Sequence, residues 1–304
     1  MRTVLVHNPG AGSGDHSKDA LLLTLRRAGL SAHYCATNEE GIAGGLGRPS
    51  ELIVVAGGDG TVAKVIAQLP DRSTPVAIVP LGVANNIARS MGIVGAPAAL
   101  AAILRPERTR CLDIGSAQGP WGHRRFVEAV GLGPLAQAIR KEPDGESKLV
   151  DGSRQGRRAL QDLLLSAEAL DIEVTVDGEA LPGDVLDLEI VNVAYTGPAL
   201  PLAPHADSGD GKLDVVCMPV GRRQQMVSWL DAPHQGPPPV NACHGRRVVI
   251  TGVFPHQRVD DDVYEPTSEP GTIMLELEHR AARIVVPPAE LAQALRNQSG
   301  DHTP

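Results

Sequence analysis

Hydrophobic and polar positions follow two alternating patterns along the first third of the chain. Short apolar runs, typical of buried strands, alternate with segments whose apolar residues recur at helical spacing. This alternation predicts a parallel sheet with helices on both faces. The expected strands are residues 3–7, 32–35, 52–56 and 76–79, and the expected helices are residues 18–28, residues 61–69 and a segment ending near Met91.

The pattern changes after about residue 110. Segments there alternate in polarity or are β-branched, and turn residues separate them, which predicts an antiparallel sheet domain built as a sandwich. A single helix is expected at residues 157–170, a long loop at 233–245 and a short final helix at 290–295. The expected strands are residues 171–176, 185–193, 212–218, 246–251, 272–277 and 282–286.

Together the two patterns predict an α/β plus all-β fold with three parts. Residues 1–120 form the parallel α/β domain, and residues 121–288 form the antiparallel β-sandwich domain. Residues 289–304 form a C-terminal helix and tail that we expect to pack back on the first domain. In the first domain, ligands are expected beyond the carboxyl ends of the parallel strands.

Composition narrows the classes of partner. Of the 304 residues, only 2% are aromatic, which disfavours stacking platforms for single-stranded nucleic acid. The net charge of −8 disfavours broad binding to phosphate backbones. We therefore expect no nucleic-acid partner.

Cysteine usage and apolar stretches indicate the compartment. The four cysteines are far apart and form no CxxC pair, which disfavours zinc ligation and disulfides and favours a reducing compartment. The N-terminal apolar run is too short for a signal peptide, and no apolar stretch approaches the ~20 residues that span a bilayer. We expect a cytoplasmic protein whose contact with any membrane is peripheral.

Glycine-rich loops follow three of the expected strands, at residues 8–14, 57–61 and 82–86. Glycine lets a backbone approach a ligand closely, and a helix start offers free N–H groups to phosphate oxygens. Asp59 lies within the second loop, where its carboxylate would repel phosphate unless a cation lies between them. The loops therefore predict a phosphate site with a metal.

These loops belong to a longer ordered set of segments that resembles the bacterial diacylglycerol kinase family, which shares a fold superfamily with sphingosine and NAD kinases. The resemblance covers nearly the whole chain. The matching segments are Asn8-Pro9 with the glycines after it, Gly57-Gly58-Asp59-Gly60-Thr61, residues 80–89, Leu112-Asp113-Ile114-Gly115, Ala203-Pro204 with residues 210–214, and residues 259–262.

The resemblance implies ATP bound between the two domains. It implies that the first domain is NAD kinase/phosphofructokinase-like and binds the nucleotide, and that the sandwich binds the lipid substrate. It also implies that Asp59 acts through water on Mg²⁺, together with Asp113. Charge neutralisation and in-line positioning are what phosphoryl transfer requires. The implied nucleotide-binding residues are Asn8, Pro9, Gly12, Gly57, Gly58, Asp59, Gly60, Thr61, Gly82, Asn85, Asn86, Arg89 and Asp113.

The sequence departs from the family pattern near the phosphates. Val83 replaces a usual threonine, Asn86 replaces a frequent aspartate, and Ala63 and Lys64 replace Asn and Glu. Asn86 still orients a metal-bound water but does not neutralise the cation. These departures leave open a catalytically weakened regulator that binds nucleotide or lipid.

Two acidic elements compete for the general base. Asp177-Gly178 follows a strand directly, where an Asp-Gly pair is usually a hairpin turn, and we favour that interpretation. The resemblance places the catalytic element at residues 260–262, with Asp260 as base and Asp262 in the place of a glutamate. Clustered carboxylates also favour a raised pKa on one of them. The alternative is a solvated acidic turn.

Asp210 lies in a turn-forming run, residues 207–211, that is rich in oxygen ligands. The resemblance implies a structural Mg²⁺ on the Asp210 carboxylate. On the sequence alone, a plain Asp-Gly hairpin is an equal alternative.

Arginines at positions 154, 157 and 158 precede a leucine-rich helical segment. Such a helix could dock on anionic lipid, but we favour leucines in the core and arginines on a solvated face.

The leading hypothesis is therefore an ATP- and Mg²⁺-dependent lipid kinase, a phosphotransferase with an alcohol acceptor, acting on diacylglycerol or a related lipid. Its expected partners are that lipid, the inner membrane surface through peripheral contact, and a second copy in a homodimer. The alternatives are the weakened regulator and, less favoured, an NAD kinase.

Overall fold

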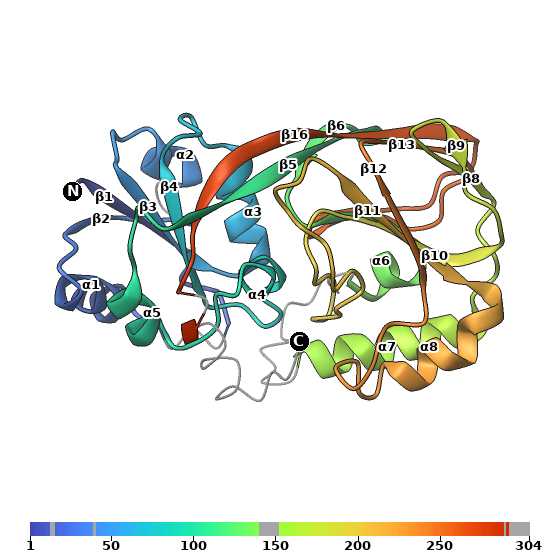
Figure 1. Cartoon of the computed structure of the whole chain (residues 1–304), viewed down its shortest axis with the longest axis horizontal. Helices are drawn as coiled ribbons and strands as arrows, with labels where there is room; N and C mark the ends of the chain where they lie inside the picture. Colours follow the sequence, from blue (N-terminus) through green and yellow to red (C-terminus); the bar gives the residue numbers. More distant parts are fainter. Residues whose placement is uncertain (13–15, 39–40, 140–151, 289, 292–304) are drawn as a thin grey trace. The chain divides into compact units, whose positions relative to one another are not determined.

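The computed structural model describes residues 1–12, 16–38, 41–139, 152–288 and 290–291 (Figure 1). These residues form two compact units: the first runs to Leu112 and resumes at Arg280, and the second runs from Asp113 to His279. The predicted boundary after residue 120 lies eight residues beyond the observed one at Leu112. The predicted boundary after residue 288 lies nine residues beyond the observed one at His279. The predicted C-terminal helix and tail, residues 289–304, lie almost entirely outside the described residues.

The first unit is built on a parallel sheet with strand order β2-β1-β3-β4. The end of β16 extends this sheet, because Arg283 and Ile284 pair parallel to β4. The strands are β1 (Thr3–His7), β2 (Ala32–Ala36), β3 (Leu52–Gly57), β4 (Pro75–Pro80) and β16 (Gly271–Val285), and the helices are α1 (Lys18–Arg27), α2 (Gly41–Leu46), α3 (Asp59–Ala67), α4 (Asn86–Ser90) and α5 (Pro97–Ile103).

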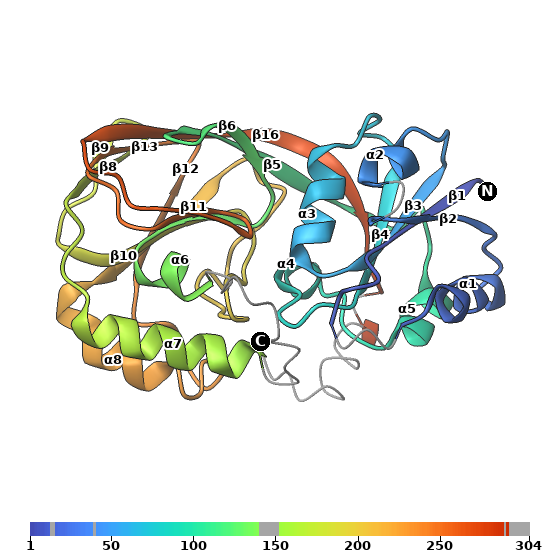
Figure 2. The same ribbon diagram turned by 180° about the vertical axis from the view of Figure 1, so that it is seen from behind.

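Helices cover both faces of this sheet, with α1 and α5 on one face and α2 and α3 on the other (Figures 1 and 2). Alternate strand residues such as Leu5, Val54 and Ala77 pack with Leu21 and Leu25 of α1. Every residue of β1 and β3 is buried. Burial on both faces explains why these strands read as continuous apolar runs in the sequence.

The second unit contains two antiparallel sheets packed face to face. In one of them the strand order is β12-β11-β10-β7-β14-β15, and the other contains β5, β6, β8, β9, β13 and most of β16. The strands not yet bounded are β5 (Thr109–Gly119), β6 (Gly122–Phe126), β7 (Ala129–Leu132), β8 (Ile172–Val176), β9 (Glu179–Ala180), β10 (Val185–Val191), β11 (Leu213–Pro219), β12 (Asn241–Gly245), β13 (Arg247–Gly252), β14 (Gln257–Val259) and β15 (Asp262–Tyr264).

The sandwich core lies between the two sheets, where Leu188 and Ile190 of β10 meet Val248 and Ile250 of β13. Other residues of β10, Leu186 and Val191, face the opposite side of their sheet and pack against helices (Figure 2). These helices are α6 (Pro134–Ile139), α7 (Gly152–Ser166) and α8 (Arg223–Trp229), with the short helix η1 (Val220–Arg222) before α8.

The leucine-rich helix predicted at residues 157–170 is α7, which begins and ends earlier. Leu160 and Leu164 are fully buried, which confirms their predicted core position, although Leu165 is 54% exposed. Arg154 and Arg158 are exposed.

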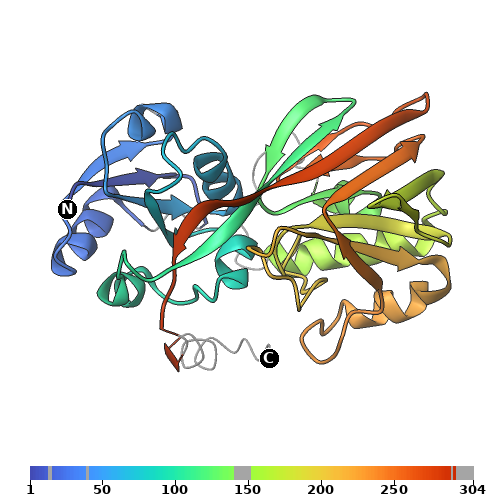
Figure 3. The same ribbon diagram turned by 45° about the horizontal axis from the view of Figure 1, so that its top comes forward.

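The predicted fold class is confirmed, but several predicted elements are wrong. The segments 272–277 and 282–286 form one continuous strand, β16, whose last residues belong to the first unit (Figure 3). The polar residues 278–280 between them suggested a turn. The predicted loop at 233–245 ends in the strand β12, and the second unit has α6 and α8 in addition to α7. Within the described residues, no helix is long and apolar enough to cross a membrane.

Candidate functional site

Three loops leave the carboxyl ends of β1, β3 and β4 at the same edge of the parallel sheet. Backbone hydrogen bonds join them: the Asn8 amide donates to the Ala56 carbonyl and the Leu81 amide donates to the Gly57 carbonyl, both at 2.9 Å. The predicted phosphate-binding loops of the first unit therefore form one cluster. Residues 13–15 of the first loop lie outside the described residues.

Glycines allow these loops to touch. A Cβ added to Gly82 would lie 2.6 Å from the Gly58 Cα, closer than any side chain tolerates. Gly12 has a φ of +60°, and a Cβ there would collide with the Leu81 carbonyl oxygen. The loops thus present closely packed backbone without side chains, which is the arrangement that fits a chain of phosphates.

Asn8 and Thr61 link the first loop to the second. The Asn8 Oδ1 accepts a hydrogen bond from the Gly10 amide at 3.1 Å, and its Nδ2 donates to the Thr61 Oγ1 at 3.2 Å. Thr61 is buried in the first turn of α3, while Pro9 is exposed at the loop surface. The side chains of Asn8 and Thr61 therefore fix the shape of the loop.

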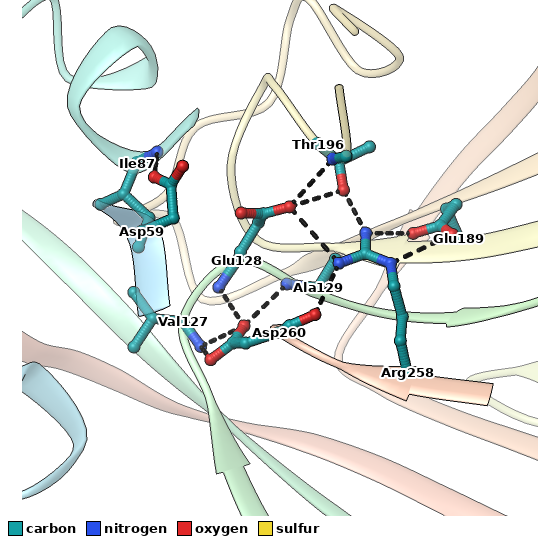
Figure 4. Close-up of polar contacts among 10 residues, drawn as sticks. Asp59, Ile87, Val127, Glu128, Ala129, Glu189, Thr196, Arg258 and Asp260 are labelled. Atoms are coloured by element: carbon teal, nitrogen blue, oxygen red, sulfur yellow. Dashed lines mark hydrogen bonds and ion pairs between the residues drawn. The ribbon is translucent and has the colours of Figure 1, made fainter. Parts of the chain in front are cut away.

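Asp59 is the first residue of α3, two residues before the predicted start of this helix. Its Oδ1 accepts a hydrogen bond from the Ile87 amide at 2.9 Å, at the beginning of α4 (Figure 4). This contact ties the second loop to the third. It also orients a partly buried carboxylate, the ligand type that Mg²⁺ prefers, within the loop cluster.

The third loop is held by its own side chains. Asn85 adopts a left-handed conformation with a φ of 52°; its Oδ1 accepts from the Gly82 amide at 2.9 Å and its Nδ2 donates to the Gly82 carbonyl at 2.7 Å. The Arg89 Nε donates to the Ala84 carbonyl at 2.8 Å. Asn86 is buried, whereas Val83 is 50% exposed at the tip of the loop.

Asp113 lies in the second unit, beside the turn that carries Asp210. Its Oδ2 accepts from the Gly211 amide at 2.7 Å, its Oδ1 lies 3.1 Å from the His279 Nδ1, and it is fully buried. The Asp210 Oδ1 accepts from the Lys212 amide at 2.9 Å. No cluster of three His, Cys, Asp or Glu side chains suited to a metal occurs among the described residues.

Asp260 occupies the turn between β14 and β15 with a φ of 49°. Its Oδ1 accepts hydrogen bonds from the amides of Val127, Glu128 and Ala129 at 3.1, 2.7 and 3.2 Å, and its Oδ2 accepts from the Val127 amide at 3.0 Å (Figure 4). The sequence element at residues 260–262 therefore presents one carboxylate that is anchored to the end of the β6–β7 connection and the first residue of β7.

Burial and, to a smaller extent, the nearby Glu128 carboxylate together raise the pKa of Asp260 to about 7, against the opposing effect of the amides of Glu128, Val127 and Ala129. A carboxyl group with a pKa near neutrality suits a general base. Asp262, by contrast, is exposed on β15, and it pairs across the hairpin with Val259.

Sequence reasoning missed a buried ionic cluster next to Asp260. Arg258 is 1% exposed, and its Nη2 lies 2.6 Å from the Glu189 Oε2 while its Nη1 lies 3.4 Å from the Glu128 Oε1. The Arg258 guanidinium also contacts the Thr196 hydroxyl (Figure 4). The available signal was acidic residues within two apolar runs: Glu128 in residues 126–130, and Asp187 and Glu189 in residues 185–191.

The competing acidic element is the predicted hairpin turn. Asp177 and Gly178, with φ of 51° and 91°, connect β8 to β9, where Val176 pairs with Glu179. The Asp177 Oδ1 accepts from the amides of Arg246 and Arg247 at 3.0 and 2.9 Å. The hairpin interpretation of this element is confirmed.

Family models match both halves of the chain. The model of the diacylglycerol kinase catalytic domain matches residues 2–117, and the model of the YegS C-terminal NAD kinase beta sandwich-like domain matches residues 148–271.

Named relatives carry the same descriptions. A diacylglycerol kinase of Bacillus subtilis is 25% identical over 71% of this chain and 73% of its own length. One from Staphylococcus haemolyticus is 26% identical over 70% of this chain and 66% of its own length. One from Mycobacterium tuberculosis is 25% identical over 61% of this chain and 60% of its own length. The chain thus matches less than two thirds of the length of the last two relatives.

Solved structures share the fold. A diacylglycerol kinase structure from Bacillus anthracis has a TM-score of 0.69 at 19% identity and covers 95% of this chain and 97% of its own. An NAD kinase from Archaeoglobus fulgidus, in complex with ATP, has a TM-score of 0.52 at 14% identity and covers 99% of this chain and 98% of its own.

Proposed function

This chain belongs to the diacylglycerol kinase family of bacterial lipid kinases, and we propose that it transfers the γ-phosphoryl group of ATP to a hydroxyl of diacylglycerol or a related lipid. The observation that carries this proposal is the anchored Asp260 carboxylate, whose pKa is raised to about 7. The glycine-packed loops of the first unit support a nucleotide as the phosphoryl donor.

In this proposal the loops at Asn8, Gly58 and Gly82 bind the phosphates of ATP with backbone amides. The ATP in the related NAD kinase structure supports a nucleotide as the ligand of this fold. Asp59 is the residue that would hold Mg²⁺ through water, and the ion, when bound, would neutralise charge on the transferring phosphoryl group. Asn85 and Arg89 hold the third loop in shape, and their contact with the nucleotide remains part of the proposal.

Asp260 is the proposed general base. The acceptor O–H bond breaks as its proton passes to the Asp260 carboxylate, the hydroxyl oxygen forms a bond to the γ-phosphorus, and the bond from phosphorus to the bridging oxygen breaks to leave ADP. An anchored carboxylate favours this step because its orientation is set before the substrate binds.

The test is transfer of labelled phosphate from ATP and Mg²⁺ to a total lipid extract, with the product lipids identified by mass spectrometry. Asp260→Asn should reduce transfer at least ~100-fold, the scale of a lost general base. Asp59→Asn should also reduce transfer strongly, because the metal neutralises charge on the transferring group. Asp177→Asn, a turn aspartate with a similar φ, should retain activity. Unchanged transfer in both Asp59→Asn and Asp260→Asn would refute the assignment.

A second candidate is a catalytically weakened regulator, favoured by Val83 at the exposed tip of the third loop and by Asn86 at its buried end. This candidate binds ATP without turnover. Calorimetry that detects ATP binding, together with no phosphate transfer to any lipid fraction or to NAD, would favour it over the kinase.

A further inference from the structure

The segment that anchors Asp260 also carries a buried acidic side chain. The Glu128 amide makes the shortest of the four amide contacts to the Asp260 carboxylate, 2.7 Å. The Glu128 side chain is 3% exposed, and its Oε1 accepts from the Thr196 hydroxyl at 2.9 Å and the Gly197 amide at 3.1 Å. Glu128 is thus fixed through both its backbone and its side chain.

Arg258 connects this side chain to the turn that carries the base. Its Nη1 lies 3.4 Å from the Glu128 Oε1 and donates to the Asp260 carbonyl oxygen at 3.1 Å. Its closer ion pair, however, is with Glu189, at 2.6 Å. The Arg258 charge therefore neutralises Glu189 first and Glu128 only in part.

Acidic and basic groups lie together in this cluster. Arg258 pairs with the carboxylates of Glu189 and Glu128 and donates to the backbone carbonyl of Asp260, while Asp187 accepts a hydrogen bond from the Leu135 amide at 2.7 Å. Burial raises the pKa of Asp187 well above its usual range, and the Glu189 charge adds to this effect. The Glu128 carboxylate likewise adds to the effect of burial in raising the pKa of the Asp260 carboxyl.

We propose that Glu128 is a positioning residue for Asp260: its amide orients the carboxylate, and its own buried negative charge makes Asp260 a stronger proton acceptor. This inference rests on the proposed function, in which Asp260 accepts the proton of the acceptor hydroxyl. Within the part of the chain that the structure describes, the titratable and charged groups around Asp260 include Glu128 before β7, Arg258 on β14, Glu189 and Asp187 on β10 behind Arg258, and Asp261 and Asp262 on its own hairpin.

The decisive variant is Glu128→Gln, which retains an oxygen for Thr196 and Gly197 but removes the charge. The acid limb of the kcat/KM–pH profile should move to lower pH by about one unit, the scale of one nearby charge. The titration midpoint of the Asp260 carboxyl, followed by ¹³C NMR and assigned with Asp260→Asn, should move in the same direction. Glu128→Asp, which retains the charge, should leave the limb near its original position.

Glu265→Gln is the matched control, because Glu265 is exposed and lies 3.5 Å from the His256 Nε2, away from the cluster. A folded Glu128→Gln protein with an unchanged Asp260 midpoint, or an equal shift in Glu265→Gln, would overturn the inference. If Glu128→Gln does not fold, the ¹³C titration of the unsubstituted protein decides. A Glu128 carboxyl that stays ionised while Asp260 titrates near neutrality supports the inference. An Asp260 midpoint near the ordinary ~3.9, or a Glu128 carboxyl that is already protonated when Asp260 titrates, contradicts it. A shifted midpoint in a protein that phosphorylates no lipid would support the inference while refuting the kinase.

Discussion

Gly131 lies on β7 between Glu189 and Arg258, which form a buried ion pair. In register, it is the partner of Glu189 on β10 and of Arg258 on β14. A Cβ at this position would collide with the Glu189 carboxylate. Because glycine has no side chain, the Glu189 carboxylate can pass over β7 at Gly131 and reach Arg258 on the strand at the other side.

Replacing Gly131 by alanine should break this arrangement. We expect Gly131→Ala to lower the free energy of unfolding by about 2 kcal/mol, because the added methyl overpacks a buried site and displaces a paired charge. Urea unfolding followed by circular dichroism measures the change. Gly221→Ala is the control, since a Cβ there meets nothing within 4 Å; equal losses in both variants would contradict the explanation.

At the scale of residues, the sequence pointed to carboxylates in marked motifs and missed the two buried glutamates that pair with Arg258. Asp59 and Asp260 were predicted because glycines or acidic neighbours mark them, whereas Asp262 was placed with Asp260 and is exposed on β15 instead. Glu128 and Glu189 each interrupt an apolar run, a pattern equally typical of a solvent-facing position. Glu189 meets Arg258 because both strands pair with β7 at Gly131, and no local sequence pattern encodes that register.

At the scale of elements, the loop cluster depends on contact between two backbones. Gly82→Ala would place a methyl 2.6 Å from the Gly58 Cα and so separate the second and third loops. We expect at least a ~10-fold loss of ATP affinity by calorimetry, since a backbone cradle tolerates little displacement. Gly236→Ala, where a Cβ meets nothing, should bind ATP normally; normal binding by Gly82→Ala would refute this role for the contact.

Two hairpin turns carry an aspartate of nearly equal φ, Asp177 at 51° and Asp260 at 49°, yet we assign them different roles. Asp177 is exposed, and its carboxylate accepts the amides of Arg246 and Arg247. Asp177→Ala should therefore lower the free energy of unfolding by about 1–2 kcal/mol while lipid phosphorylation is retained. Loss of phosphorylation in a folded Asp177→Ala protein would move the catalytic role to this turn.

Elements were predictable where one periodicity held along their whole length. The buried strands β1 and β3 were located within a residue, because burial on both faces leaves an uninterrupted apolar run. β16 was divided in two because its polar middle, including Arg280 at a φ of 52°, resembles a turn. Its continuity comes from pairing with β13 and then with β4, which are distant in the sequence.

At the scale of the whole molecule, buried acidic groups set the response to pH. Burial raises the pKa of Asp260 to about 7 and that of Asp214 to about 6, and it also raises the pKa of Asp187 and Glu189. Each group holds its proton more tightly in the folded than in the unfolded chain. His7 acts in the opposite direction, because burial lowers the pKa of its imidazole.

The free energy of unfolding should therefore fall as pH rises from about 4 to about 7. An acid whose pKa is ~3.9 when unfolded and about 7 when folded leaves the folded state with more bound protons throughout this range, and stability then decreases with increasing pH. Urea midpoints measured at half-unit steps from pH 4.5 to pH 8 test this. Asp260→Asn removes one of the titrating groups and should flatten the decline; a midpoint that rises steadily over the range, or the same slope in Asp260→Asn, would show that the buried carboxyl groups do not control stability.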